Sequence, residues 1–207
     1  MLQRRKYPRS IRTLAVLGLT AIALAGCGGG STPQSEPPAA GTTTATAPTT
    51  TTTATNPLPG AGMTIVVAQT TAKQTALLER VAIGHHEGFD RVVFQFRGVG
   101  LPAYRIQYEE PPFAEDGSGN PVAVNGNAFV TVRMEPASGF DLNTGEGELV
   151  YKGPKRLPGA GSVVQEVVRT GDFEAVLSWV VGLEAKVPFL VTTASSPSRL
   201  IVDFRSV

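Results

Sequence analysis

The sequence has one cysteine, two histidines and one tryptophan among its 207 residues. A single cysteine excludes an intrachain disulfide, so the folded part depends on its hydrophobic core. No apolar stretch reaches the roughly twenty residues that a membrane-spanning helix needs. Five of the 18 Lys and Arg precede Cys27 and no acidic residue does, which leaves 13 basic and 17 acidic residues and a net charge of −4. This balance excludes nucleic acid as a partner, and no basic run is present that would hold anionic lipids.

The only cysteine, Cys27, ends the sequence Leu24-Ala25-Gly26-Cys27, which closes a short apolar run behind a basic cluster. A basic segment, an apolar segment and small residues are the three parts of a secretory signal. Leu-Ala-Gly-Cys at this place is typical of a bacterial lipobox. It predicts a signal peptide over residues 1–26, cleavage after Gly26, and attachment of acyl chains such as palmitate to Cys27.

Two or three acyl chains give stable anchoring in a membrane. The basic cluster orients the signal with its positive end inside the cell. We therefore expect the protein to be lipid-anchored to the outer face of the bacterial cytoplasmic membrane, facing the cell wall.

Residues 27–62 are rich in Thr, Ser, Pro, Gly and Ala, and only Glu36 is charged. Such a segment has too little apolar surface to offset the entropy of ordering it. We interpret it as a disordered tether with a mean reach of about 30–35 Å.

Residues 63–207 form a single predicted domain in which hydrophobic residues recur with a period of two. Alternation with β-branched and aromatic residues, separated by Gly, Asn and Asp turns, is typical of antiparallel strands. We expect eight to ten strands packed as a β-sandwich, including one continuous strand from Phe173 to Val181 that buries Trp179. For Lys73 to Arg80 the pattern favours a strand over a short helix. Arg91, Arg199 and Asp203 alternate with core residues, which indicates cross-strand ion pairs.

Three stretches resemble the AMIN-like domain of actinobacterial secreted proteins and lipoproteins: His85 to Phe94, Gly171 to Glu174, and Ser198 to Phe204. The resemblance covers most of residues 75–206. It implies a non-catalytic β-sandwich module of the cell envelope, of the kind found beside peptidoglycan amidases, and it supplies no binding residues.

The only histidine cluster is His85-His86-Glu87. A metal-dependent hydrolase needs three protein ligands around an open position. Neighbouring side chains on a strand point to opposite faces, and no third histidine is available. We therefore predict no metal, no cofactor and no enzymatic activity, with a hydrolase built on this cluster as the least favoured alternative. Two groups with alternating oxygen ligands are interpreted as plain turns rather than calcium sites; they are Asp116, Ser118 and Asn120, and Asp141, Asn143 and Glu146.

The aromatic residues Tyr104 and Tyr108 share a strand face with Ile106 and are the candidates for stacking on a ligand. The leading hypothesis is a membrane-anchored module that docks on peptidoglycan or on an envelope protein. The alternative is a lipoprotein that carries a lipid or another solute, which requires an interior cavity of several hundred Å³.

Overall fold

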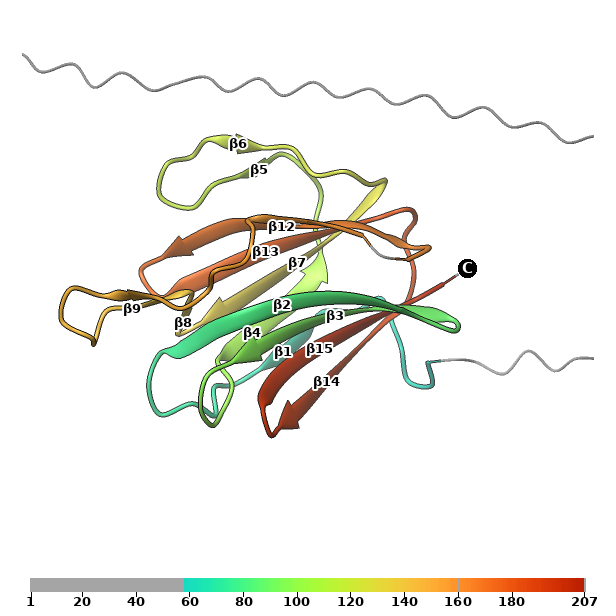
Figure 1. Ribbon diagram of the computed structural model, residues 1–207. Coiled ribbons are helices and arrows are strands. Elements are labelled where there is room, and N and C mark those ends of the chain that lie inside the picture. The colour runs from blue at the N-terminus through green and yellow to red at the C-terminus, as the bar shows by residue number, and fades with distance from the viewer. Residues whose placement is uncertain (1–57, 160, 207) are drawn as a thin grey trace, which may run out of the picture. The chain divides into compact units, whose positions relative to one another are not determined.

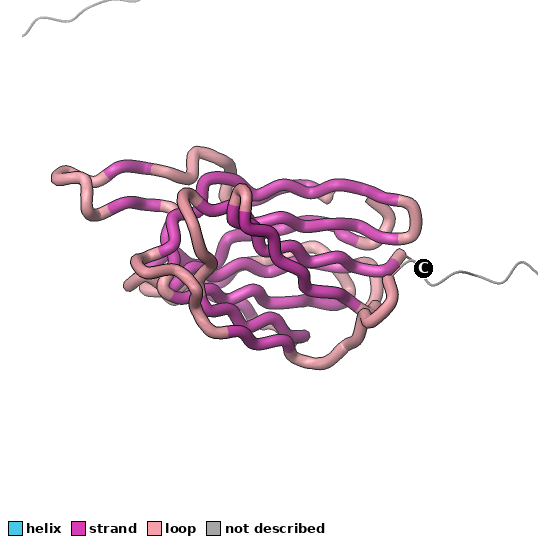
Figure 2. Tube along the Cα trace, turned by 90° about the horizontal axis from the view of Figure 1, so that it is seen from below, coloured by secondary structure: helices cyan, strands magenta, loops and turns pink. Residues whose placement is uncertain are grey.

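The structure is a computed structural model that describes residues 58–159 and 161–206, and every regular element among them is a strand (Figures 1 and 2). This confirms the predicted all-β class. Among these residues no helix is long and apolar enough to cross a membrane. The predicted signal peptide, Cys27 and most of the tether lie outside the described residues.

Two large sheets make up the domain (Figure 1). The six-stranded sheet has the order β1 (Val66–Ala68), β4 (Ala103–Tyr108), β7 (Ala128–Glu135), β13 (Val176–Leu183), β12 (Val164–Phe173), β11 (Arg156–Pro158). The five-stranded sheet has the order β14 (Phe189–Ser195), β15 (Ser198–Arg205), β3 (Phe89–Phe96), β2 (Ala76–His86), β8 (Ala137–Ser138). Two short ribbons pair β5 (Phe113–Ala114) with β6 (Pro121–Val122) and β9 (Phe140–Asp141) with β10 (Glu148–Leu149). All pairs are antiparallel except β2 with β8.

The core lies between the two sheets, because alternate residues of each strand point inward. In β3, Val92, Phe94 and Phe96 are almost fully buried, and the residues between them are only partly buried. Trp179 of β13 lies edge-on to Phe94 of the opposite sheet, with ring centroids 5.9 Å apart. The predicted burial of Trp179 is therefore confirmed, and its indole joins the two sheets.

The expected continuous strand from Phe173 to Val181 is wrong. β12 ends at Phe173, a tight turn follows at Glu174 and Ala175, and β13 begins at Val176. Both turn residues have positive φ values, 50° and 59°, as the favoured two-residue hairpin turns require. Glycine or asparagine normally signals such a turn, and neither is present here. As a consequence Phe173 is half exposed instead of lying in the core.

The packed domain also begins before the predicted boundary at Met63. Leu58 is 4% exposed, and Gly62 exchanges two backbone hydrogen bonds with Phe189, of 3.0 and 2.8 Å. The chain therefore joins the domain beside the first residue of β14, which is an edge strand of the five-stranded sheet.

Candidate ligand groove

A groove of about 270 Å³ lies on the outer face of the six-stranded sheet, on the side away from the core. Outward-facing residues of β4, β7 and β13 form its floor in two cross-strand rows. One row contains Arg105, Arg133 and Ser178, and the other contains Gln107, Thr131 and Val180. The register of the three central strands thus places five polar side chains side by side on one surface.

The hairpin of β5 and β6 forms the wall of this groove, and Figure 1 shows it standing beside the sheet near β12. Phe113 of β5 is 8% exposed and packs edge-on against Phe129 of β7, with ring centroids 5.3 Å apart. Val180 is only 2% exposed although it points away from the core. The hairpin therefore carries a small apolar cluster of its own, which fixes one side of the groove.

A second contact ties the hairpin to β12. The backbone N–H of Asp116 donates to the carbonyl of Thr170 at 2.9 Å. A Cβ atom on the neighbouring Gly171 would overlap the carboxylate of Asp116. Glycine at position 171 therefore allows the hairpin to approach the sheet closely enough to form the wall.

The charges of the groove are unusual because Arg105 and Arg133 lie directly opposite each other on β4 and β7. Like charges in opposed cross-strand positions destabilise a sheet. Arg105 donates to Gln107 at 3.1 Å, and Arg133 lies 3.7 Å from the exposed carboxylate of Glu135, a pair too long for a good hydrogen bond. The two guanidinium groups thus remain available to a negatively charged group of a ligand.

The remaining polar groups suit a ligand that carries hydroxyl and amide groups. Thr131 donates to the carboxylate of Glu109 at 3.0 Å, whereas Ser178 and Gln107 offer further donors and acceptors to the groove. The volume is just below the roughly 300–1,000 Å³ of small-molecule pockets, which fits a small part of a larger ligand. Within the described ranges, no group of three or more His, Cys, Asp or Glu is placed to hold a metal ion.

The predicted stacking residues lie on the inner side of β4. Tyr108 packs against the core, and its hydroxyl donates to the carbonyl of Val187 at 2.6 Å and accepts the Val187 N–H at 2.9 Å. Burial raises the pKa of both Tyr104 and Tyr108. Tyr104 also lines a shallow hollow of about 210 Å³ that shares Arg105 and Arg133 with the groove. Both tyrosines pack against the core, and the Tyr108 hydroxyl already has two hydrogen-bond partners.

His85 and His86 make structural contacts at one end of the sandwich. His85 Nδ1 lies 2.7 Å from Oδ1 of Asp90, which is fully buried, and Asp90 Oδ2 accepts the backbone N–H groups of Val163 and Val164 at 2.8 and 2.9 Å. Burial opposes ionisation of Asp90, but the hydrogen bonds from His85 and these N–H groups hold its pKa below the usual value. His86 instead stacks on Phe89 with ring centroids 4.8 Å apart. The two imidazoles therefore have separate structural partners, and Glu87 lies in the exposed turn beyond them.

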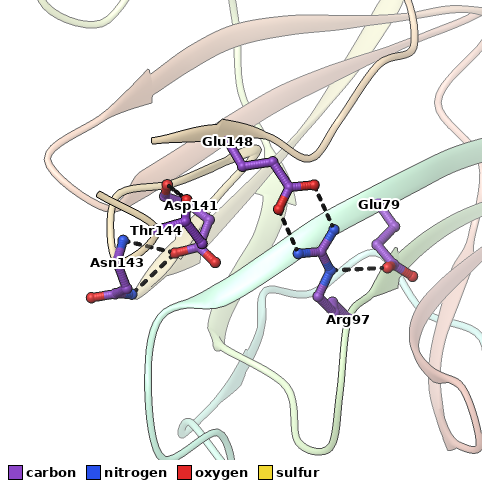
Figure 3. A network of polar contacts seen from close by, with 6 residues as sticks. All are labelled: Glu79, Arg97, Asp141, Asn143, Thr144 and Glu148. Carbon is purple, nitrogen blue, oxygen red and sulfur yellow. Dashed lines mark hydrogen bonds and ion pairs between the residues drawn. The ribbon is translucent and has the colours of Figure 1, made fainter. Parts of the chain in front are cut away.

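The two oxygen-rich segments use their side chains to form turns. Asp141 Oδ1 accepts hydrogen bonds from the backbone N–H and the side-chain amide of Asn143, at 2.9 and 3.2 Å, and Thr144 donates to the Asp141 carbonyl (Figure 3). Ser118 donates to Glu115 at 3.1 Å, and this bond is the main reason that the pKa of Glu115 is lowered. Aspartate and serine commonly stabilise turns in this way.

Sequence reasoning missed the residues of the groove floor. Arg105, Gln107, Thr131, Arg133 and Ser178 appear in the sequence as ordinary polar positions of alternating strands. The one available signal for the groove is an arginine at an exposed position on each of two strands. Only the register of β4 with β7 shows that these two arginines are neighbours.

The comparisons with known proteins identify the domain. A search of curated proteins and a search of solved structures gave no match. The family model of the AMIN-like domain matches residues 76–206, which include ten of the eleven strands of the two large sheets. This match covers more than half of the sequence and confirms the resemblance of the strand motifs, so the chain belongs to the AMIN-like domain family.

Proposed function

We propose that the protein is a membrane-anchored docking module of the cell envelope, and that the groove beside the β5–β6 hairpin binds peptidoglycan. AMIN-like domains are generally non-catalytic envelope modules associated with peptidoglycan. The anchor is the lipid on Cys27, which holds the domain at the outer face of the cytoplasmic membrane.

The observation that carries the proposal is the opposed pair Arg105 and Arg133 within a row of hydrogen-bonding side chains. Peptidoglycan combines sugars that carry hydroxyl and acetamido groups with short peptides that carry carboxylates. Arginine binds a carboxylate through two parallel hydrogen bonds, and Ser178, Thr131 and Gln107 match the neutral groups. A peptide carboxylate placed between the arginines would also relieve their repulsion.

The packing of the interior favours docking over the carriage of a solute. Large side chains fill the space between the sheets, among them Trp179, Phe94, Phe96, Phe204 and Met134, which are at most 1% exposed. Two further hollows of about 470 and 580 Å³ are lined by loops and strand ends, and neither lies between the sheets. A carrier would instead need its cavity in the interior.

A second candidate function, docking on an envelope protein, is favoured by an apolar patch at one end of the domain. Phe140, Leu142 and Phe173 line a hollow of about 470 Å³ and are 37%, 80% and 52% exposed. Leu149 pairs with Phe140 across β9 and β10 and is 52% exposed. Exposed apolar residues gathered in this way mark protein interaction sites.

The anchor is tested by labelling cells with a radioactive fatty acid. We expect label on the native protein and none on the Cys27→Ser variant, because the thiol is the attachment point. Equal labelling of the two proteins would contradict the anchor.

Wall docking is tested by cosedimentation of residues 28–207 with purified peptidoglycan at low and high salt, beside a denatured control. We expect saturable binding that weakens in high salt but persists, because salt screens the contact of the exposed arginines with a carboxylate, whereas the hydrogen bonds to neutral sugar groups remain. Absence of binding at both salt concentrations would overturn the peptidoglycan proposal and leave the apolar patch as the surface to pursue.

A further inference from the structure

The outer face of the five-stranded sheet carries a second group of arginines, far from the groove. Arg80 of β2, Arg91 of β3, and Arg199 and Arg205 of β15 all occupy outward positions, because inward positions on these strands hold the core residues. Arg80 and Arg199 both lie opposite Gln95 of the central strand. Arg199 and Arg205 are six residues apart on one strand, so the face is about 20 Å long.

Acidic groups neutralise only part of this face. Asp203 forms a two-pronged ion pair with Arg91, at 2.7 and 2.8 Å. Glu79 and Glu148 both bind Arg97, a fifth arginine at the end of the sheet, which lies between them in Figure 3. Glu87 is a further acidic residue near this face, in the exposed turn between β2 and β3.

The other three arginines of the face, Arg80, Arg199 and Arg205, form no ion pair within the described residues. The Nε atoms of Arg199 and Arg205 are buried and have no hydrogen-bond partner there. Three arginines on one face that form no ion pair within the described part are notable in a chain that has a net charge of −4 after Cys27. The fold thus gathers positive charge that the sequence distributes over more than a hundred residues.

The place where the chain enters the domain indicates what this face meets. Gly62 pairs with Phe189 at the start of the edge strand β14, and Arg205 donates its backbone N–H to the neighbouring Pro188 carbonyl at 3.0 Å. The segment that leads back to Cys27 therefore joins the domain at the Arg205 end of the arginine face. Thirty residues, 28–57, separate Cys27 from the described part. The tether that their composition predicts would have a mean reach of about 30 Å at this length.

We propose that the arginine face, defined by Arg80, Arg91, Arg199 and Arg205, rests on an anionic phospholipid surface, with the guanidinium groups against lipid phosphates. Guanidinium groups bind phosphate oxygens through paired hydrogen bonds. Each arginine near an anionic membrane strengthens binding roughly fivefold, so the affinity of the free domain is modest. The proposed anchor at Cys27 raises the local concentration of the domain at the membrane, so a modest affinity is enough to keep the arginine face bound to lipid. The affinity itself comes from the arginine face and not from the anchor.

This arrangement leaves the groove free to bind the wall. The arginine face and the groove belong to the outer surfaces of opposite sheets of the sandwich. A domain that rests on lipid through the five-stranded sheet therefore turns its six-stranded sheet, with Arg105 and Arg133, away from the membrane.

The test is flotation of residues 28–207, without lipid on the chain, with vesicles of phosphatidylcholine alone or mixed equally with phosphatidylglycerol. We expect binding only to the mixed vesicles, with loss at high salt. Arg199→Glu with Arg205→Glu should lower the partition coefficient more than tenfold, and the exposed single change Arg80→Glu should lower it at least fivefold. The double variant Arg199→Lys with Arg205→Lys keeps both positive charges and should retain most of the binding to the mixed vesicles.

The matched control is Lys73→Glu with Lys152→Glu, which changes the net charge equally at exposed positions outside the strands. It should bind the mixed vesicles nearly as well as the native chain. Equal loss in both double variants, or absence of binding to the mixed vesicles, would overturn the proposal. Binding to soluble polyphosphate without binding to vesicles would also overturn it and would assign the face to an anionic polymer. Because the chain carries no lipid and the vesicles contain no peptidoglycan, failure here is distinct from failure of the anchor or of the groove.

Discussion

Replacing Asp90 by alanine is expected to lower the free energy of unfolding by about 2–4 kcal/mol. The Asp90 carboxylate is fully buried and accepts the N–H groups of Val163 and Val164, which are themselves 2% and 1% exposed. Without the carboxylate these two donors lose their partner in a place that water does not reach. Urea denaturation of the native and variant chains measures the difference.

The effect of Asp90 should depend on pH. Its pKa is lowered in the folded state, so the ionised carboxylate stabilises the fold at pH values above its unfolded pKa of about 3.9. That contribution to stability is lost as the pH falls through the lower pKa that Asp90 has in the folded state. The stability difference between the native chain and Asp90→Ala should therefore be full near pH 7 and shrink below about pH 4.

Two variants serve as controls for Asp90. Asp90→Asn keeps an oxygen acceptor in a side chain of the same shape, so it should lower the free energy of unfolding less than Asp90→Ala does. Because asparagine does not ionise, this position should then make no pH-dependent contribution to stability in acid. Glu87→Gln alters an exposed turn residue and should change stability by no more than about 0.5 kcal/mol. An alanine variant as stable as the native chain at neutral pH would contradict the role assigned to Asp90.

Reversing the charge of both groove arginines, Arg105→Glu with Arg133→Glu, is expected to weaken peptidoglycan binding at least tenfold. The change removes two guanidinium groups and places two carboxylates where a ligand carboxylate would lie. The introduced carboxylates would repel a carboxylate of the ligand, so the variant loses more affinity than removal of the arginines alone would cause. Cosedimentation with purified peptidoglycan measures the binding constant.

The Lys73→Glu and Lys152→Glu control has the same net charge as this groove variant and should retain binding. The single change Arg105→Gln should weaken binding while leaving the fold as stable as before or slightly more stable, because it removes the repulsion from Arg133. If the lysine control lost as much binding as the groove variant, net charge rather than the groove would explain the effect.

Alternation in the sequence predicted the fold well where a strand has one buried and one exposed face. β3 and β7 follow this pattern along their whole lengths. Of the cross-strand ion pairs expected for Arg91, Arg199 and Asp203, the structure confirms the pair of Arg91 with Asp203 between β3 and β15. The expectation was wrong for Arg199, which forms no ion pair within the described residues. The turn at Glu174 and Ala175 escaped prediction because its residues adopt positive φ without glycine or asparagine. The position of Leu58 also escaped it, since one apolar residue in a Thr- and Pro-rich segment gives no periodic signal.

The groove and the arginine face could not be predicted, because both depend on which strands become neighbours. Arg105 and Arg133 are 28 residues apart, and Arg80 and Arg199 are 119 apart. Arg105, Arg133 and Arg199 alternate with core residues on their strands, and Arg80 follows the exposed Glu79, so each appears as an ordinary exposed position. Only the strand order of the two sheets brings these charges together. Tyr104 and Tyr108 stood out in the sequence as aromatic residues, but their strand turns them towards the core.

The most direct test of the central claim is a titration of isotope-labelled residues 28–207 with soluble peptidoglycan fragments that contain both disaccharide and peptide, followed by amide chemical shifts. We expect the shifts to change on β4, β7 and β13 around Arg105, Thr131 and Ser178 and on the β5–β6 hairpin, with few changes on the five-stranded sheet. Shift changes confined to the apolar patch around Leu142, or no change at saturating fragment concentration, would contradict the groove as the wall-binding site.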